Sequence, residues 1–192
     1  NLAMMPFRNR EEVRFTLQDF DVIETANFSS GLLCTEGVVG RKKTRHCAGW
    51  LDDCGFRTTI NERRYTEHDR RTDDDPRIAL CGFDRGRPRS FLGDTGFDLI
   101  VECGLGDTLA DFDQIHTHTF PSEINCPKAL WGHIQDRPKM VEEEDLPLFT
   151  EGKQNCGQIA IDMAGKAVST SFVGAMAGAL VVAELLRVFN GG

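Results

Sequence analysis

The chain has 192 residues, a hydrophobic content of 40%, a charged content of 27% and a formal net charge of −8. This length and composition predict a soluble globular domain with a sizeable core. The acidic balance disfavours nucleic acid and anionic membranes as partners, because both bind basic surfaces. We therefore expect a single domain over residues 1–192 that binds neither nucleic acid nor a membrane.

The seven cysteines are scattered, and no two of them form a C-x-x-C pair. This spacing predicts neither a zinc ribbon nor a disulfide framework. With no signal peptide at its start, the sequence favours a reducing, cytoplasmic compartment. The apolar run at 172–189 favours a buried helix that packs on a sheet through its glycines and alanines, because Glu184 and Arg187 interrupt it too early for a membrane span.

Short apolar runs alternate with helical patterns along the chain. The patterns predict strands at 13–18, 56–65, 75–84, 97–106 and 114–120, and helices at 38–55, 89–96 and 167–189. Residues 121–155 are rich in proline and acidic residues and predict a long acidic crossover loop. The alternation predicts an α/β fold with a Rossmann-like, mainly parallel sheet flanked by helices.

Acidic residues directly follow two of the predicted strands. Asp19 and Asp21 follow the first strand, and Asp84 follows the third. Ligands of parallel α/β sheets bind beyond the carboxyl ends of the strands, where an acid after the second strand accepts hydrogen bonds from ribose hydroxyls. That acid lies about 20 residues after a glycine-rich turn, so counting back from Asp19 puts such a turn before Asn1. The alternative is that Asp19 and Asp21 are ordinary turn residues.

Three motifs and the C-terminal segment narrow this choice. The motifs are LQDFDVIETANFSSGLL, VGRKKTRHCAGWL and CGFDRGRPR, and the segment begins CGQIAIDMAGKAV. In this order they resemble the ThiF/MoeB/HesA family, the adenylating domain of ubiquitin-activating enzymes. The resemblance runs from about Val13 to Gly192. It implies a ThiF-type fold whose glycine-rich phosphate loop lies outside these residues.

The resemblance implies ATP-dependent adenylation of the C-terminal carboxylate of a ubiquitin-like or sulfur-carrier protein, with ATP and Mg²⁺ as cofactors and a homodimer as the assembly. Fixed cations and a metal suit this reaction, because a carboxylate attacks the α-phosphate and both reactants are anionic. Lys43 and Asp84 are the implied catalytic residues, and Asp84 is the implied metal ligand. The residues implied to bind the cofactor are Asp19 and Asp21 near the ribose, Asn27 and Lys43 at the phosphates, Asp84 at Mg²⁺, and Arg89 after it.

Some relatives in this family pass the activated carboxylate to a cysteine, whose thiolate is a strong nucleophile. Cys126, in the expected polar loop, and Cys156, at the head of the last segment, are the accessible candidates, with a structural role as the alternative for each. His116 and His118 share one face of a predicted strand. No third ligand accompanies them, so we expect polar structural roles for both.

The chain departs from the family pattern at Ser30-Gly31, where the family carries Arg-Gln, and at Arg85, where it carries Asn. Two rival functions therefore stay open. One is a catalytically impaired scaffold that keeps the fold and binds a ubiquitin-like partner. The other is an NAD-binding oxidoreductase, in which Asp19 would recognise the NAD ribose and Lys43 and Asp84 would have no evident role.

Overall fold

The computed structural model describes residues 1–29, 31–105, 114–134 and 171–191. In this part of the chain the strands form two sheets. The first sheet is a parallel pair of β1 (Arg14–Gln18) and β2 (Arg57–Asn61). The second sheet has the order β3 (Ile78–Cys81), β4 (Leu99–Leu105) and β5 (Ile115–Phe120).

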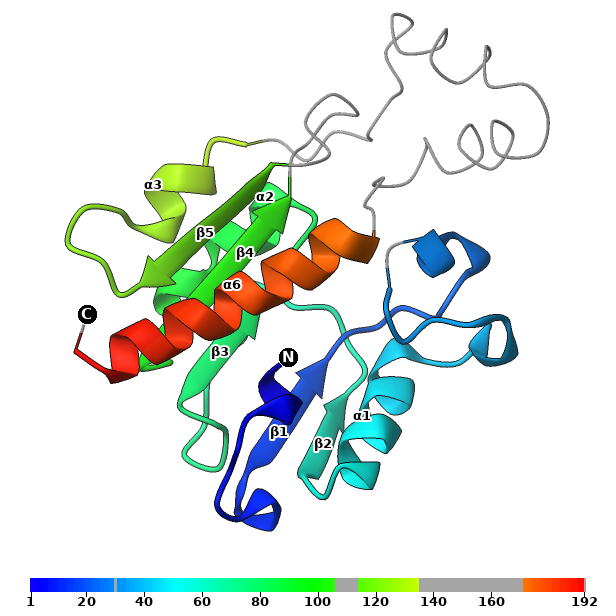
Figure 1. The fold of residues 1–192 in the computed structure, drawn as a ribbon. Coiled ribbons are helices and arrows are strands. Elements are labelled where there is room, and N and C mark those ends of the chain that lie inside the picture. Colours follow the sequence, from blue (N-terminus) through cyan, green and yellow to red (C-terminus); the bar gives the residue numbers. More distant parts are fainter. Residues whose placement is uncertain (30, 106–113, 135–170, 192) are drawn as a thin grey trace, which may run out of the picture.

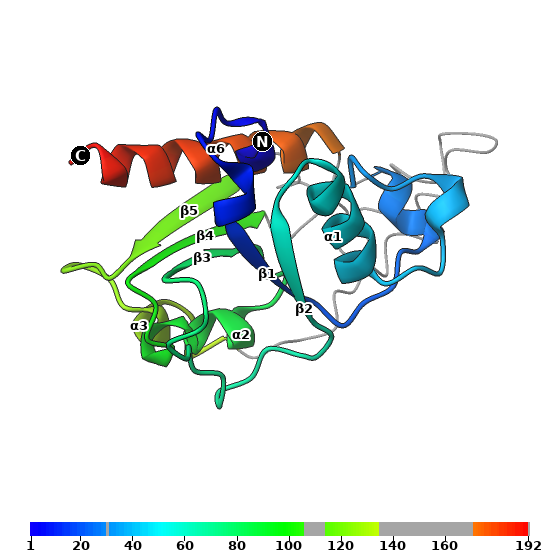
Figure 2. The same cartoon turned by 90° about the horizontal axis from the view of Figure 1, so that it is seen from below.

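Four α-helices accompany the strands in the described residues: α1 (Lys43–Asp53), α2 (Gly86–Ser90), α3 (Pro127–Trp131) and α6 (Ser171–Phe189). Helix α1 connects β1 to β2, and α2 follows β3 (Figure 1). Helix α6 runs across one face of β4 and β5, while α2 and α3 lie on the other side (Figure 2). Each of the five predicted strands contains an observed strand, and the predicted α/β class is confirmed.

The expectation of one mainly parallel sheet is wrong in part. Strands β3 and β4 are parallel, but β5 is antiparallel to β4, and β1 and β2 belong to a separate sheet. A parallel crossover needs a dozen or more residues, and the interval from Leu105 to Ile115 is shorter than that. The predicted loop at 121–155 also needs correction, because Pro127 begins the short helix α3; residues 135–155 lie outside the described part.

The ends of α1 show how the sequence builds this local structure. Gly55 has a φ of +88° and donates its N–H to Asp52 O, while Phe56 donates its N–H to Leu51 O at 3.1 Å. This pair of bonds is a Schellman motif, which ends the helix at a glycine. The turn buries Phe56, where Phe7 and Phe15 meet its ring edge-on at 5.5 and 5.2 Å. The chain then continues directly into β2.

Helix α6 carries apolar side chains both on the face that packs on the sheet and on the exposed face. Val173, Ala177, Val181 and Leu185 are buried, and the middle two pack on Val101 and Cys103 of β4. Ala177 thus confirms the expected packing of this helix on the sheet through alanine, whereas Gly178 lies against Asn1 and does not make this contact. The opposite face leaves several large side chains more than one third exposed, namely Met176, Leu180, Leu186 and Phe189.

Within the described residues, no helix is both long enough and apolar enough to cross a membrane.

Candidate nucleotide-binding site

Asp19 and Asp21 lie in the loop that follows β1. The carboxylate of Asp19 accepts the N–H of Asp21 at 2.8 Å, which closes a local turn. Asp21 in turn forms an ion pair with Lys43, the first residue of α1, and Lys43 Nζ lies 3.0 Å from Asp21 Oδ2. Their side chains are 45% and 34% exposed, so solvent screens this pair and a competing anion can reach the ammonium. The structure therefore brings three of the predicted site residues together.

Basic residues just before α1 and in its first turn place positive charge near this loop. Val22 and Lys42 form an isolated antiparallel bridge, and Lys42 Nζ donates to Phe20 O. A pocket of about 350 Å³ lies here, and it is lined by Gly40, Arg41, Lys42, Arg45 and His46. Arg45 is already paired through two nitrogens with Glu62, at 2.8 and 3.0 Å. The loop after β1 thus faces a local basic surface on an acidic chain.

Asn27 belongs to the short 3-10 helix Thr25–Ser29. Its side-chain oxygen accepts the N–H of Glu24 at 2.8 Å, so the amide caps its own turn. Ser30, which replaces the arginine of the family pattern, lies outside the described residues. The predicted phosphate contact of Asn27 stays a prediction.

Asp84 is exposed in the loop between β3 and α2. Arg89, from α2, lies beneath this loop and is only 13% exposed. Its Nε donates to Phe83 O at 3.1 Å, and a terminal nitrogen donates to the same oxygen. Arg89 Nε also lies 2.9 Å from Oε1 of Glu102. Arg89 therefore supports the Asp84 loop from the interior of the protein, and its guanidinium does not face solvent.

Glu102 is fully buried in β4 and forms the centre of a charged cluster that the sequence analysis missed. His118, its direct neighbour on β5, places Nδ1 3.2 Å from Glu102 Oε2. Trp131 packs edge-on against His118 and lies under the Arg89 guanidinium. Burial raises the pKa of Glu102, and the charges of Arg89 and His118 limit that rise. An acid inside an otherwise apolar strand was the available signal, because a buried charge requires a partner.

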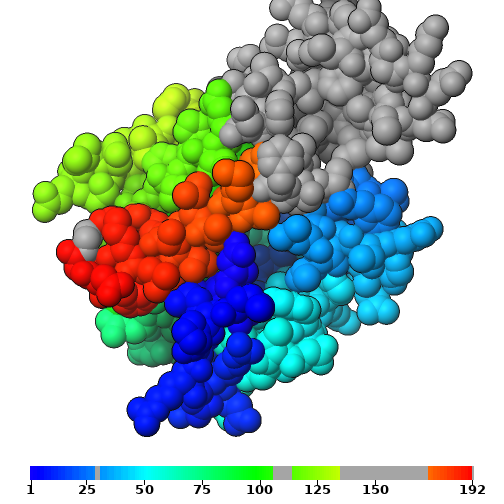
Figure 3. All heavy atoms as spheres, viewed as in Figure 1, coloured from blue at the N-terminus to red at the C-terminus, as the bar shows by residue number. Residues whose placement is uncertain are grey.

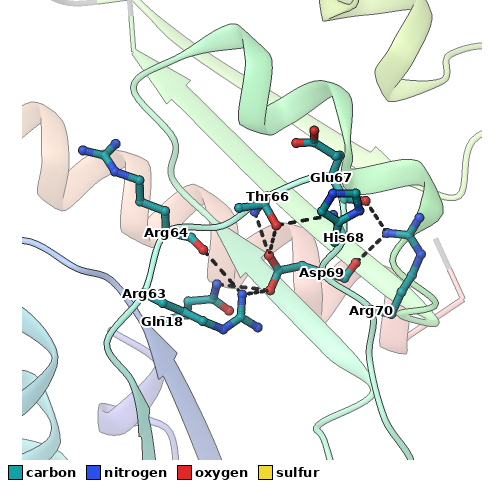
Figure 4. A network of polar contacts seen from close by, with 8 residues as sticks. All are labelled: Gln18, Arg63, Arg64, Thr66, Glu67, His68, Asp69 and Arg70. Carbon is teal, nitrogen blue, oxygen red and sulfur yellow. Dashed lines mark hydrogen bonds and ion pairs between the residues drawn. The ribbon is translucent and has the colours of Figure 1, made fainter.

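A second missed network holds the loop between β2 and β3 (Figure 4). Asp69 is 7% exposed and accepts both the N–H and the hydroxyl of Thr66, at 2.7 and 3.0 Å. It also pairs with Arg63 and accepts a hydrogen bond from Gln18, the last residue of β1. Burial raises the pKa of Asp69, but these bonds together outweigh burial and lower it below its ordinary value. The Thr-x-x-Asp spacing was a usable sequence signal.

The structure describes one of the two candidate cysteine nucleophiles. Cys126 is exposed, directly before α3, and Cys156 lies outside the described residues. Burial and the charge of Glu102 raise the pKa of Cys81 to about 12, and burial also raises the pKa of Cys103. A raised pKa lowers the fraction of thiolate, so neither strand thiol is a candidate nucleophile. In the part of the chain that the structure describes, no three His, Cys, Asp or Glu side chains gather as a metal site.

The chain is a mixed α/β protein with acidic residues in the loops that follow β1 and β3. Comparison with known protein families identifies its family. The chain belongs to the BilD C-terminal domain family, whose model matches residues 1–192.

One curated relative is the bacterial E1-like protein BilD from Collimonas sp. (strain OK412), which is 38% identical over 195 residues. That match covers 100% of this chain and 41% of the relative, so the chain spans about two fifths of the relative's length. The solved structure described as E. coli MccB + MccA-N7isoASN is 13% identical, covers 91% of this chain and 49% of that chain, and has a TM-score of 0.47. The description of this relative as E1-like agrees with the resemblance to the adenylating domain of ubiquitin-activating enzymes.

Proposed function

We propose that this chain forms part of an enzyme that uses ATP and Mg²⁺ to adenylate the C-terminal carboxylate of a ubiquitin-like or sulfur-carrier protein. The observation that carries the proposal is the pairing of Asp21 with Lys43 beside Asp19, where β1 ends and α1 begins. Membership of a family with an E1-like relative supports it. The activity is proposed for the whole protein, because the chain spans only part of that relative.

The residues present fit the cofactor. Asp19 uses one carboxylate oxygen for the Asp21 N–H, which leaves the other oxygen for ribose hydroxyls. The ion pair with Asp21 holds Lys43 in the loop region beside Asp19. Both side chains of this pair are partly exposed, so a triphosphate can compete with Asp21 for the Lys43 ammonium. Asp84 is exposed, and Mg²⁺ prefers one or two carboxylates together with phosphate oxygens and waters. Bound Mg²⁺ would offset the repulsion between ATP and the attacking carboxylate.

Binding of Mg²⁺-ATP to the full-length protein tests this proposal. We expect Lys43→Gln and Asp84→Asn each to weaken binding about tenfold or more, because each removes one charge-assisted contact. Lys128→Gln, an exposed substitution on α3, is the matched control and should leave binding unchanged. Absence of ATP binding by the full-length protein would favour the scaffold function, and binding of NAD in its place would favour the oxidoreductase.

Transfer of the activated carboxylate to a thiol is a further step of the same proposal, with Cys126 and Cys156 as acceptors. Cys126 is exposed and open to a partner's C-terminus. Thiol-sensitive attachment of the carrier protein should disappear in either Cys126→Ser or Cys156→Ser while ATP–pyrophosphate exchange persists. Attachment that survives in the double variant would remove this step from the proposal.

A further inference from the structure

The basic pocket beside the first turn of α1 contains none of the residues proposed to bind ATP. Its volume is about 350 Å³, and it is lined by Gly40, Arg41, Lys42, Arg45 and His46. Spacings of three and four residues place Lys42, Arg45 and His46 on one face of the helix. Lys43 instead pairs with Asp21. The pocket therefore lies on a different face of α1 from the proposed nucleotide contact.

The positive charges that line this pocket are only partly neutralised. Arg45 is paired with Glu62 through two nitrogens, and Lys42 Nζ donates to the uncharged carbonyl of Phe20. Among the residues that the structure describes, no carboxylate forms an ion pair with Arg41 or Lys42. The Arg41 side chain is exposed, so an anion can reach its guanidinium. On a chain with a net charge of −8, the pocket is a local site for a negative group.

The start of α1 departs from the usual composition of a helix N-terminus. Its N-cap residue is Lys42, which makes no side-chain capping bond, and its first turn contains no acidic residue. Residues with a side-chain oxygen are preferred at this position because they accept a free backbone N–H, and positive charges there oppose the helix dipole. Departures from such local rules are expected at functional sites. A bound anion would accept the free N–H groups and balance the charge.

Exposed apolar side chains border the pocket. His46 Nε2 lies 2.8 Å from Leu33 O, and Val39 directly precedes Gly40 of the lining. Leu32, Leu33 and Val39 are each more than one third exposed. Their loop lies at the end of the molecule opposite α3 (Figure 1 and Figure 2), and Figure 3 shows it in light blue at the surface beside α1. A free inorganic anion would leave this border exposed, whereas a protein segment with an apolar side chain would bury it.

We propose that this pocket and its apolar border form a docking surface for an acidic segment of a partner protein. A carboxylate of the segment would occupy the pocket beside Arg41 and Lys42, and a neighbouring apolar side chain would cover Leu32. Nucleic acid is disfavoured, because the cluster neutralises few phosphates and the chain as a whole is acidic. The proposal does not depend on the proposed adenylation.

Binding of a fluorescent peptide to the full-length protein, followed by anisotropy, tests the proposal. The probe is a peptide of repeated Glu-Glu-Leu units, and its matched control has Gln in place of each Glu. The glutamate peptide should bind about tenfold or more tightly than the control, because its carboxylates form charge-assisted contacts. Arg41→Glu should weaken this binding about tenfold or more. Lys128→Glu makes the same change of charge on an exposed residue of α3 and should leave binding unchanged.

Several results of this experiment would overturn the proposal. Equal binding of the two peptides, or no detectable binding of the glutamate peptide, would remove the acidic partner. Displacement of the peptide by an equal concentration of inorganic phosphate would assign the pocket to a free anion. Duplex DNA that binds more tightly than the peptide and is lost in Arg41→Glu would assign it to nucleic acid. Loss of Mg²⁺-ATP binding in Arg41→Glu would assign the pocket to the nucleotide site.

A substitution at the N-cap of α1 gives a second readout. Lys42→Ser removes one cation of the pocket and supplies the capping oxygen that the helix lacks. The melting temperature of this variant should rise above that of the unaltered protein, while the glutamate peptide should bind about fivefold or more weakly. These opposite changes are expected of a residue that serves binding at the expense of stability. A lower melting temperature with unchanged peptide binding would make Lys42 a structural residue and contradict the proposal.

Discussion

The ion pairs Lys43–Asp21 and Arg89–Glu102 have nearly equal lengths, 3.0 and 2.9 Å, and both support loops that follow parallel strands. Their surroundings differ. The side chains of the first pair are 34% and 45% exposed, whereas those of the second are 13% and 0% exposed. Solvent screens the first pair, so breaking it costs little. The second pair has lost its hydration, so loss of one partner leaves the other charge buried without compensation.

This difference separates a residue that can bind a ligand from one that supports the fold. Lys43 can leave Asp21 for a phosphate at small cost, because water compensates the carboxylate. Arg89 cannot leave Glu102 and the Phe83 carbonyl without burying an unpaired acid. The family pattern alone placed both residues at the cofactor, with Lys43 also as a catalytic residue. Burial identifies Arg89 as a support of the Asp84 loop, and the exposure of Lys43 is consistent with its proposed contact with ATP.

The largest expected effect comes from breaking the buried pair. Glu102→Leu should lower the free energy of unfolding by about 3–5 kcal/mol, because the guanidinium of Arg89 would stay buried without its partner. Urea unfolding followed by circular dichroism measures this change. The double variant Arg89→Met/Glu102→Leu is the matched control and should be more stable than Glu102→Leu. A double variant that is less stable than the single one would show that the charge itself is not the cost.

The next largest effect is expected for Asp69→Ala, which should lower the free energy of unfolding by about 1–3 kcal/mol, because it leaves half-buried hydrogen-bond donors unsatisfied. Asp75 provides a control within the same loop, because it accepts the N–H and hydroxyl of Thr72 in the same Thr-x-x-Asp arrangement. It lacks the contacts that Asp69 makes with Gln18 and Arg63. Equal losses of stability in Asp69→Ala and Asp75→Ala would refute a special role for Asp69.

Glu184, on α6, should show the clearest pH dependence. The hydrogen bonds from Arg187 and then from Thr119 lower its pKa to about 2. A carboxylate whose pKa is lowered by folding stabilises the folded state above its ordinary pKa of 4.5, and this contribution is lost as the pH falls from there toward 2. Carbon-detected NMR titration of Glu184 checks the value. Thr119→Val should raise the measured pKa, and an unchanged value would exclude that bond.

The smallest effect on stability is expected for the half-exposed pair. Lys43→Gln should change the free energy of unfolding by less than about 1 kcal/mol, because solvent screens this pair. Thermal unfolding of the variant, beside Asp21→Asn, measures the change. A loss comparable with that of Glu102→Leu would place Lys43 among the structural residues and end the contrast between the two pairs.

The sequence predicted the local elements well, because short apolar runs and a glycine stop are local signals. The run around Val101 and the glycine after α1 located β4 and the helix end correctly. The direction of β5 and the separation of the sheets depend on connection lengths and on strand neighbours, which periodicity does not report. Glu102 was overlooked because its partners, Arg89 and His118, come from distant positions in the sequence. The contact between Asp21 and Lys43 was not foreseen either, although both residues were candidates.

Gly104 lies on β4 where the Arg89 guanidinium crosses the strand. A Cβ atom at position 104 would lie 2.7 Å from Arg89 Nη1, closer than packed atoms come. The space at position 104 and the placement of the Arg89 guanidinium are therefore coupled. Homologous sequences that replace this glycine with a larger residue should also replace the arginine with a shorter one, so the pair gives a covariation signal for recognising this support of the loop.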